Sequence, residues 1–309
     1  MRHIFGENIH INRDCAVAIG KFDGLHKGHM ALIAKLKEVA KKRGLAAAVL
    51  SFVPHPAAVL AGVNVPFILS PSEKIYVLNQ LNLDYFIEYP FTKQFAQISP
   101  EDFLKNIVFE QLSGKSLVVG ENFRFGKNGA GDAAFAKEIG CTLGLHVHTM
   151  ALVTQDTAEI SAKNIRRAVT AKDFRATKDM CGRNFFLTGE VVHGKKKGRE
   201  MDFPTANIIP DEKKLLPPCG VYATTTYVDG TAYASVTNIA PCIVETHLLD
   251  FCGNLYGHSL RVDFLGWMRD TEKFSSYENL AAQLAQDVIG RRQNHYDDGR
   301  GGGRHQTEV

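Results

Sequence analysis

The sequence lacks the features that mark membrane-spanning, secreted and nucleic-acid-binding proteins. It contains no apolar run of about 18 residues, which argues against a transmembrane helix. Its N-terminal residues do not follow the charged-then-apolar layout of a signal peptide. The net charge is +3, from 36 basic and 33 acidic residues, and so small an excess does not by itself indicate a nucleic-acid-binding surface. We expect neither a membrane nor a nucleic acid as a partner.

Cysteine pairs and low-complexity segments are also scarce. The six cysteines are scattered, and no two of them form a CxxC pair, which argues against a zinc knuckle. Their apolar neighbours favour reduced thiols and a cytoplasmic protein. The glycine-rich tail contains no apolar cluster, so we expect residues 293–309 to be disordered.

The first part of the chain alternates strand-like and helix-like segments. Two of the helix-like segments begin with Ser-Pro, in which the serine caps the helix and the proline takes its first position. Such alternation predicts a parallel sheet with helices on both faces. The predicted strands are 15–20, 45–52, 84–91 and 116–120, and the predicted helices are 29–44, 70–81 and 99–112. The apolar stripe expected to bury the first helix is Leu32, Ile33, Leu36, Val39 and Ala40.

The pattern changes near residue 183 into β-rich runs separated by glycine turns. Asp-Gly at 229–230 and Gly-Asn at 253–254 are typical of turns between antiparallel strands, so this half is predicted to be an antiparallel barrel or sandwich. A single helix at 275–290 follows it. A length of 309 residues agrees with about two domains, and we place their boundary at 183/184.

The segment GKFDGLHKGH, residues 20–29, joins the first predicted strand to the first predicted helix. A helix start presents free N–H groups and a partial positive charge, which together bind anions, and the glycines allow close approach of a ligand. His26 and His29, three residues apart, can both face one phosphate and stabilise charge that develops on it. The alternative is a tight turn with two incidental histidines.

In its surroundings this motif resembles the HxGH nucleotidyltransferase superfamily. Within that superfamily the match is to the prokaryotic bifunctional riboflavin kinase/FMN adenylyltransferase (FAD synthetase) family. The resemblance implies a Rossmann-like α/β domain over residues 1–183 that transfers an adenylyl group from ATP to FMN. The segments that carry it are GKFDGLHKGH (20–29), SFVPHPAAVL (51–60), PFTKQFAQISPEDF (90–103), VVGENFRFGKNGAGD (118–132) and ISAKNIRRAV (160–169).

The resemblance also implies which residues form the first site. His26 and His29 would hold the ATP phosphates while an FMN phosphate oxygen attacks the α-phosphorus and pyrophosphate leaves. Positioning and charge neutralisation supply most of the catalysis in such a reaction. The other nucleotide-binding residues implied are Gly20, Phe22, Asp23, Gly24, Gly28, Ser161 and Arg166, and the residues implied to line the flavin pocket are Asn122, Arg124 and Phe125.

One departure from the family falls in this half. The second nucleotide motif of the family usually reads Ile-Ser-Ser-Thr-x-Ile-Arg, but this chain has Ala162 and Lys163 in place of the hydroxyl pair. Two hydrogen-bonding groups at a helix start are thereby replaced by a methyl group and a cation.

A second candidate site lies in GEVVHGKKKGREMDFPTANI, residues 189–208. Thr205 and Asn207 are two residues apart and point the same way on an extended strand. Their hydroxyl and amide oxygens are suitable ligands for magnesium, and a basic glycine loop can hold a polyphosphate. The alternative for the basic run is a solvated loop.

This half resembles the riboflavin kinase module, which the resemblance places at 184–292 as a β-barrel. The segments that carry it are GEVVHGKKKGR, FPTANI, PPCGVYA (217–223), VETHLLDFCGNLYG (244–257) and MRDTEKFSSYENLAAQLAQD (268–287). The resemblance implies Mg²⁺ with ATP at Thr205 and Asn207, Glu245 as general base on the riboflavin 5′-hydroxyl, and Arg269 at the flavin. It also implies nucleotide binding by Gly194, Gly198 and Arg199.

Two departures concern the second half, and three hypotheses stay open. Asp202 stands where the family usually has glycine, and only residues 240–244 separate Ile239 from Glu245, which shortens a flavin-side loop. The leading hypothesis is an enzyme that makes FMN from riboflavin and FAD from FMN. The alternatives are an enzyme with one of these activities, and a flavin- or nucleotide-binding regulator. A cytidylyltransferase is a weaker alternative because it would share only the HxGH half.

Overall fold

The computed structural model describes residues 1–151, 153–155, 158–193, 203–241 and 243–293. The chain forms two compact units, Met1–Ile165 and Arg166–Val309. In the described residues, no helix combines the length and apolar character needed to cross a membrane.

The first unit is built on a six-stranded sheet in which every neighbouring pair of strands is parallel. The strand order is β1-β4-β3-β2-β5-β6, so β2 lies between β3 and β5. The chain therefore builds outward from β2 in one direction and then returns to its other side, which is the arrangement that opens a crevice at the carboxyl ends of the strands. The strands are β1 (Arg2–Phe5), β2 (Cys15–Ile19), β3 (Ala46–Val53), β4 (Tyr85–Pro90), β5 (Gly114–Gly120) and β6 (His146–Met150).

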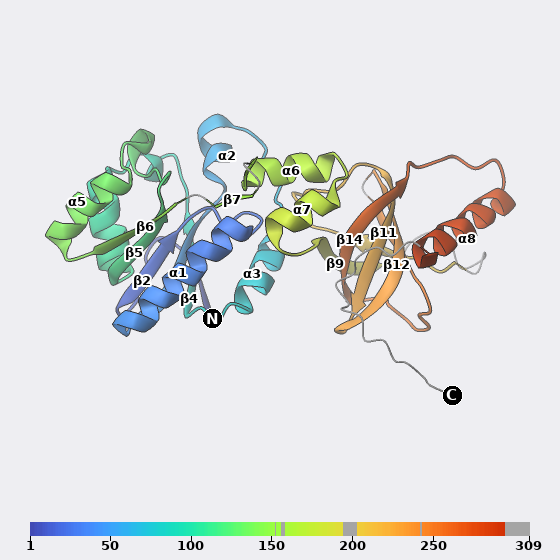
Figure 1. The fold of residues 1–309 in the computed structure, drawn as a ribbon, viewed down its shortest axis with the longest axis horizontal. Coiled ribbons are helices and arrows are strands. Elements are labelled where there is room, and N and C mark those ends of the chain that lie inside the picture. Colours follow the sequence, from blue (N-terminus) through green and yellow to red (C-terminus); the bar gives the residue numbers. More distant parts are fainter. Residues whose placement is uncertain (152, 156–157, 194–202, 242, 294–309) are drawn as a thin grey trace. The chain divides into compact units, whose positions relative to one another are not determined.

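Helices cover this sheet, and α1 runs beside β2, as Figure 1 shows. The predicted apolar stripe of α1 is confirmed, because Leu32, Ile33, Leu36, Val39 and Ala40 are its buried residues. The Ser-Pro helix starts are also confirmed: Ser70 forms a complete capping box with Glu73, and Ser99 caps the next helix. The helices of this unit are α1 (Lys27–Arg43), α2 (Pro56–Ala61), α3 (Pro71–Asn79), α4 (Pro100–Asp102), the π-helix η2 (Phe103–Gln111) and α5 (Ala133–Leu143). Two 3₁₀ turns, η1 (Phe95–Gln97) and η3 (Lys127–Gly129), and a short hairpin of β7 (Thr154–Gln155) and β8 (Ala158–Glu159) complete it.

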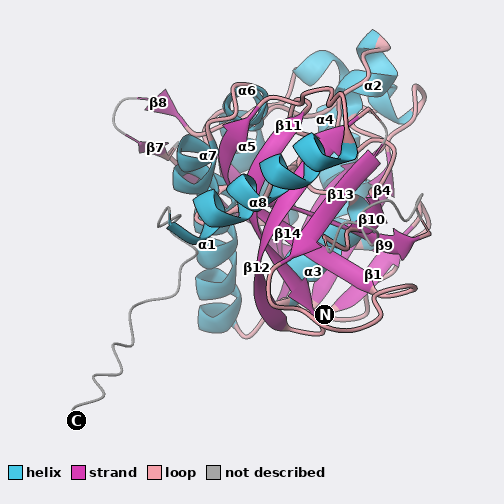
Figure 2. Ribbon diagram, turned by 90° about the vertical axis from the view of Figure 1, so that its right-hand side faces the viewer, coloured by secondary structure: helices cyan, strands magenta, loops and turns pink. Residues whose placement is uncertain are grey.

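The second unit is a closed antiparallel barrel, which decides between the predicted barrel and sandwich. Its strands follow one another in the order β10-β13-β12-β11-β14-β9. Helix α8 (Tyr277–Gln293) lies across the outside of the barrel, as Figure 2 shows. Its Val288 packs against the buried cluster of Val221, Val236 and Leu249. The strands are β9 (Phe185–Val192), β10 (Ala206–Ile209), β11 (Gly220–Val228), β12 (Thr231–Ala240), β13 (Ile243–Leu248) and β14 (Ser259–Arg269).

The chain passes from the first compact unit to the second at 165/166, whereas the sequence-based domain boundary is at 183/184. The division between the units falls within helix α6 (Ala162–Thr170), and α7 (Phe174–Cys181) follows it and packs on β9 and β14. Phe174 accounts for this packing, because its ring stacks on Phe264 and meets Tyr222 edge-on. The burial of one aromatic side chain thus assigns α7 to the barrel unit.

The inside of the barrel contains a network of buried hydroxyl groups on β11, β12 and β13. Thr224 Oγ1 lies 2.8 Å from both Ser235 Oγ and Thr237 Oγ1, and Thr237 donates to Thr246 Oγ1 at 2.9 Å. Thr226 and Thr246 are 3.2 Å apart although β11 and β13 are not neighbours, so their side chains meet across the interior. Because strand side chains alternate between faces, the residues beside them, among them Asn238 and Glu245, point outward.

We predict that Thr224→Val destabilises the barrel by about 1–2 kcal/mol, because the valine leaves Ser235 and Thr237 with fewer partners in a buried site. Trp267, the single tryptophan, lies on β14 and reports unfolding of this unit in urea by its fluorescence. The control is Thr231→Val at the exposed start of β12, which should shift stability by less than about 0.5 kcal/mol. Equal unfolding midpoints for the two variants would contradict a stabilising role for the network.

Candidate functional sites

The turn that leaves β2 has an unusual backbone. Phe22 and Leu25 have φ angles of 48° and 41°, in the left-handed region, and Gly24 between them has 78°. Bulky residues rarely adopt such angles, and each costs on the order of 1–3 kcal/mol unless its surroundings hold it. Both side chains are fully buried, so packing holds the strained turn in one shape.

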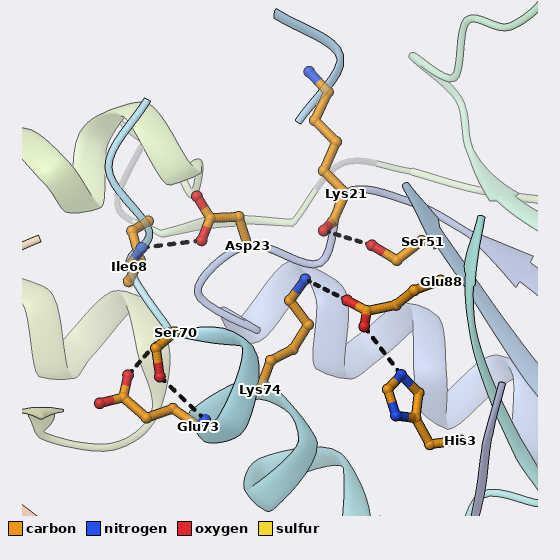
Figure 3. Close-up of polar contacts among 9 residues, drawn as sticks. All are labelled: His3, Lys21, Asp23, Ser51, Ile68, Ser70, Glu73, Lys74 and Glu88. Atoms are coloured by element: carbon orange, nitrogen blue, oxygen red, sulfur yellow. Dashed lines mark hydrogen bonds and ion pairs between the residues drawn. The ribbon is translucent and has the colours of Figure 1, made fainter. Parts of the chain in front are cut away.

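Hydrogen bonds fix the same turn to two neighbouring segments, as Figure 3 shows. The Ser51 hydroxyl on β3 donates to the Lys21 carbonyl at 3.0 Å. On the other side, the Ile68 N–H donates to Asp23 Oδ1 at 3.1 Å inside the protein. The predicted nucleotide-binding residue Asp23 therefore connects the turn to the segment that opens α3.

A buried ion cluster anchors α3 to the sheet close to this turn (Figure 3). Glu88 on β4 is in register with Ser51 and accepts from Lys74 Nζ at 3.5 Å. Its other oxygen lies 3.0 Å from His3 Nε2 on β1. Since Lys74 and Glu88 are both buried, loss of either partner would leave a charge in the interior, which typically costs several kcal/mol.

His26 and His29 come together at the start of α1, as the sequence predicts. Their rings stack with centroids 3.8 Å apart, and the His29 backbone N–H donates to His26 Nδ1 at 3.4 Å. Because His26 Nδ1 accepts there, the neutral imidazole carries its proton on Nε2, where it can be donated. Gly28 allows this close packing, since a Cβ at that position would lie 3.1 Å from the His26 ring.

The electrostatics of this helix start favour an anion. No acidic residue occurs in the first turn of α1, so the partial positive charge of the helix end is not cancelled there. The site also follows β2, the strand at which the sheet order reverses. The geometry can therefore bind a phosphate group and stabilise negative charge that grows on it.

The remaining predicted nucleotide residues of this half lie on two elements. Gly20 directly follows β2, and a Cβ at this position would lie 3.1 Å from the Phe22 ring. Ser161 caps α6, since its hydroxyl accepts from the Asn164 N–H at 3.3 Å, and Arg166 follows on the same helix. Lys163, the cation that replaces a family hydroxyl, is exposed on the first turn of that helix.

The three residues predicted to line the flavin pocket have different surroundings. Asn122 is exposed. Arg124 pairs with Asp132 at 3.1 Å, and the pKa of that carboxyl is lowered first by the Phe135 backbone N–H and then by Arg124. Phe125 is buried and packs against several other phenylalanine rings, so in this structure its side chain belongs to the core.

In the barrel unit, cross-strand register places two predicted site residues, Asn207 and Glu245, in one row with Asn238. Asn207 on β10 lies opposite Glu245 on β13, and Glu245 lies opposite Asn238 on β12. The Asn238 Nδ2 group donates to Glu245 Oε2 at 3.4 Å. All three side chains point out of the barrel, so two amides flank one carboxylate on a partly buried surface.

His247 is a residue that sequence reasoning missed. Its Nδ1 lies 2.9 Å from the Pro204 carbonyl and its ring meets Phe203 edge-on, so it fastens the segment before Thr205 to β13. Because a carbonyl only accepts, His247 must carry a proton on Nδ1. The signal was the spacing Glu245-Thr246-His247, which on a strand puts the carboxylate and the imidazole on one face.

Arg269 has a structural partner in this unit. Its Nε and Nη2 donate to Asp287 Oδ1 and Oδ2 of α8 at 2.9 and 2.7 Å, and this hydrogen-bonded pairing raises the pKa of the guanidinium. The fork thus ties α8 to β14. On either side of the segment predicted to be short, β12 and β13 stay paired as far as Ala240 and Ile243.

Several predictions lie outside the described residues or concern a metal. Gly194, Gly198, Arg199 and Asp202 all fall in residues 194–202, which the structure does not describe. Thr205 is described and is exposed at the entry to β10. Within the described ranges, no group of three or more His, Cys, Asp and Glu side chains could enclose a metal ion. The groups in register with Glu245 are amides, and amide and carboxylate oxygens are donors that suit magnesium.

Comparison with known proteins assigns each half of the chain to a family. The FAD synthetase family model matches residues 8–164, and the riboflavin kinase family model matches residues 181–294. The bifunctional riboflavin kinase/FMN adenylyltransferase of Listeria monocytogenes is 33% identical over 283 residues, covering 88% of this chain and 89% of its own. The protein with that description from Escherichia coli K12 is 32% identical over 289 residues, covering 90% and 92%.

One solved structure resembles almost the whole chain. It is the crystal structure of a Streptococcus pneumoniae protein described as a macrolide-efflux protein, with a TM-score of 0.84 and 26% identity. It covers 94% of this chain and 99% of its own. The two-unit architecture is therefore that of an experimentally known fold.

The role of Asp23 in holding the histidine turn leads to a prediction about amide exchange. Asp23→Ala should speed hydrogen exchange of the Ile68 amide by roughly tenfold or more, because the buried N–H loses this acceptor. Asp23→Asn, which keeps an accepting oxygen, should change it much less. Exchange of Ile68 followed by NMR checks this, with the exposed Asp14→Ala as control. Unchanged protection in Asp23→Ala would contradict the assigned contact.

Proposed function

The chain belongs to the family of bifunctional riboflavin kinases/FMN adenylyltransferases, and we propose that it carries out both steps with ATP as co-substrate. The barrel unit phosphorylates riboflavin to FMN, and the α/β unit adenylylates FMN to FAD. The observation that carries the proposal is the row of Asn207, Glu245 and Asn238 in one unit together with the stacked His26 and His29 at a helix start in the other.

In the kinase step, Glu245 is the general base. The 5′-hydroxyl oxygen of riboflavin forms a bond to the γ-phosphorus of ATP, the bond to the ADP oxygen breaks, and Glu245 takes the hydroxyl proton. Asn207, in register beside it, orients the phosphate end of the nucleotide. His247 supports this arrangement by fixing the backbone just before Thr205.

Magnesium fits the oxygen donors of this surface. Thr205 and Asn207 would hold the ion, which when bound supplies charge neutralisation for the ATP phosphates. Asn207 lies on β10 and supplies an amide oxygen, and Thr205 directly before this strand supplies a hydroxyl. The sequence and its resemblance to the family support magnesium binding at these residues. They also support an enzyme that works in the cytoplasm without nucleic-acid partners.

In the adenylyltransferase step, the α/β unit binds ATP and FMN and orients them for reaction. An FMN phosphate oxygen attacks the α-phosphorus of ATP, and pyrophosphate leaves with the electron pair of the broken bond. His26 donates from Nε2 to a phosphate oxygen, and the start of α1 stabilises the same charge. Ser161 and Arg166 on α6 contribute to nucleotide binding, and Asn122, Arg124 and Phe125 to the flavin side. Rotation of Arg124 away from Asp132 would free its guanidinium for a phosphate.

We predict that Glu245→Gln lowers the rate of FMN formation from riboflavin by roughly a hundredfold, because glutamine cannot accept the hydroxyl proton. The rate of FAD formation from added FMN should stay within about twofold of wild type, because that reaction uses the other unit. Chromatography of the products with each flavin substrate measures both rates in the same protein preparation.

The reciprocal control is His26→Asn. Asparagine can still cap a helix, so α1 should keep its start while the proton donor at the ring position is lost. FAD formation from FMN should then fall by roughly a hundredfold, with riboflavin phosphorylation unchanged. Loss of both reactions in either variant, or of neither, would contradict the assignment of one step to each unit.

A further inference from the structure

Asn238 is a polar residue on the outer face of the barrel for which neither the sequence nor the proposed mechanism gives a role. It lies on β12 directly opposite Glu245 and makes a hydrogen bond from Nδ2 to Glu245 Oε2. The other polar atom of this side chain, Oδ1, is buried and has no hydrogen-bond partner within the described part of the chain. A residue that only tied strands together would be expected to satisfy both ends of its amide.

The orientation of this amide is set by the carboxylate. An ionised carboxylate accepts hydrogen bonds and cannot donate them, so the nitrogen of Asn238 must face Glu245 and its oxygen must face away. Leaving that oxygen buried without a donor costs on the order of 1–3 kcal/mol. The Asn238 side chain therefore keeps its contact with the carboxylate although its buried Oδ1 lacks a donor.

The contact also divides the two oxygens of Glu245 between two tasks. Oε2 is held by Asn238, whereas no hydrogen bond joins Glu245 to Asn207 within the described residues on its other side. Oε1 is thus left for the proton that the base takes up, and Asn207 is left for the nucleotide. A carboxylate held at one oxygen keeps a narrower range of orientations than one that rotates freely.

We propose that Asn238 is a positioning residue of the kinase step, which holds the Glu245 carboxylate in its reactive orientation through the amide N–H. This inference rests on the proposed function of the barrel unit. The groups in register with Glu245 on both flanking strands are uncharged amides, and His247 is a titratable group further along β13 on the same face.

Two substitutions separate the amide N–H from the rest of the side chain. Asn238→Ala removes donor and acceptor and should lower kcat for riboflavin phosphorylation roughly tenfold, with KM for ATP within about twofold. Asn238→Asp keeps the oxygen and the shape but removes the donor, so it should lose at least as much activity. It also places a second carboxylate beside the base, which should move the acid limb of the kcat–pH profile upward by about one unit.

The decisive comparison is a double-mutant cycle with Glu245→Gln. If Asn238 acts through the carboxylate, Asn238→Ala should cause no further loss in the Glu245→Gln background. FAD formation from FMN by the same preparations should stay at the wild-type rate, because that reaction uses the other unit. The control for folding of the barrel is its unfolding midpoint in urea, followed by the fluorescence of Trp267 on β14.

Full kcat in Asn238→Ala, an unmoved pH profile in Asn238→Asp, or additive losses in the double variant would overturn the inference while leaving kinase activity established. A wild-type chain that forms no FMN from riboflavin would overturn the proposed kinase function and the inference with it.

Discussion

Strand β13 carries its carboxylate on the outside of the barrel only while its alternate side chains stay inside. Thr246 is held there by Thr226 and Thr237, and Glu245 and His247 on either side of it face outward as a consequence. A slip of one residue would turn the carboxylate into the barrel and the hydroxyl out to solvent. The buried hydroxyl network therefore sets the register on which the second site depends.

In the first unit, a strained turn, and not strand register, sets the direction of the candidate reactive side chains. Its histidines are aligned because the chain between β2 and α1 follows a strained path, and buried Phe22 and Leu25 hold it there. Asp23 and Ser51 secure the turn from two sides through bonds to backbone groups. In both units, packing and hydrogen bonds of neighbouring residues determine where the candidate reactive side chains point.

Periodicity and local motifs predicted much of this structure. The buried stripe of α1, the capping box at Ser70 and the parallel strands of the first unit follow from local patterns, because each depends on neighbours a few residues away. The edge strand β1 was missed, since its short sequence is mostly exposed. The packing of α7 on the barrel includes the Phe174 contact with Phe264, which joins residues far apart in the chain and could not be read from local patterns.

In the candidate sites too, local sequence patterns did not predict contacts between residues far apart in the chain. The spacing of His26 and His29 predicted their meeting at a helix start, and the resemblance supplied Glu245. Asn238 could not be assigned from spacing, because its role comes from cross-strand register. The spacing of His247 from Glu245 placed the two on one face of a strand, but the contact of His247 with the Pro204 carbonyl became visible only in the fold. The pairing of Arg269 with Asp287 likewise became visible only in the fold.

The central claim is that one chain holds two working sites with separate chemistry. The most direct measurement is chromatography of the products that the wild-type protein forms from ATP and magnesium, given riboflavin in one reaction and FMN in another. The account predicts FMN and FAD from riboflavin, and FAD from FMN. Binding of both flavins without any product would contradict it and identify the chain as a flavin-binding regulator, and product from one substrate alone would show that a single unit is active.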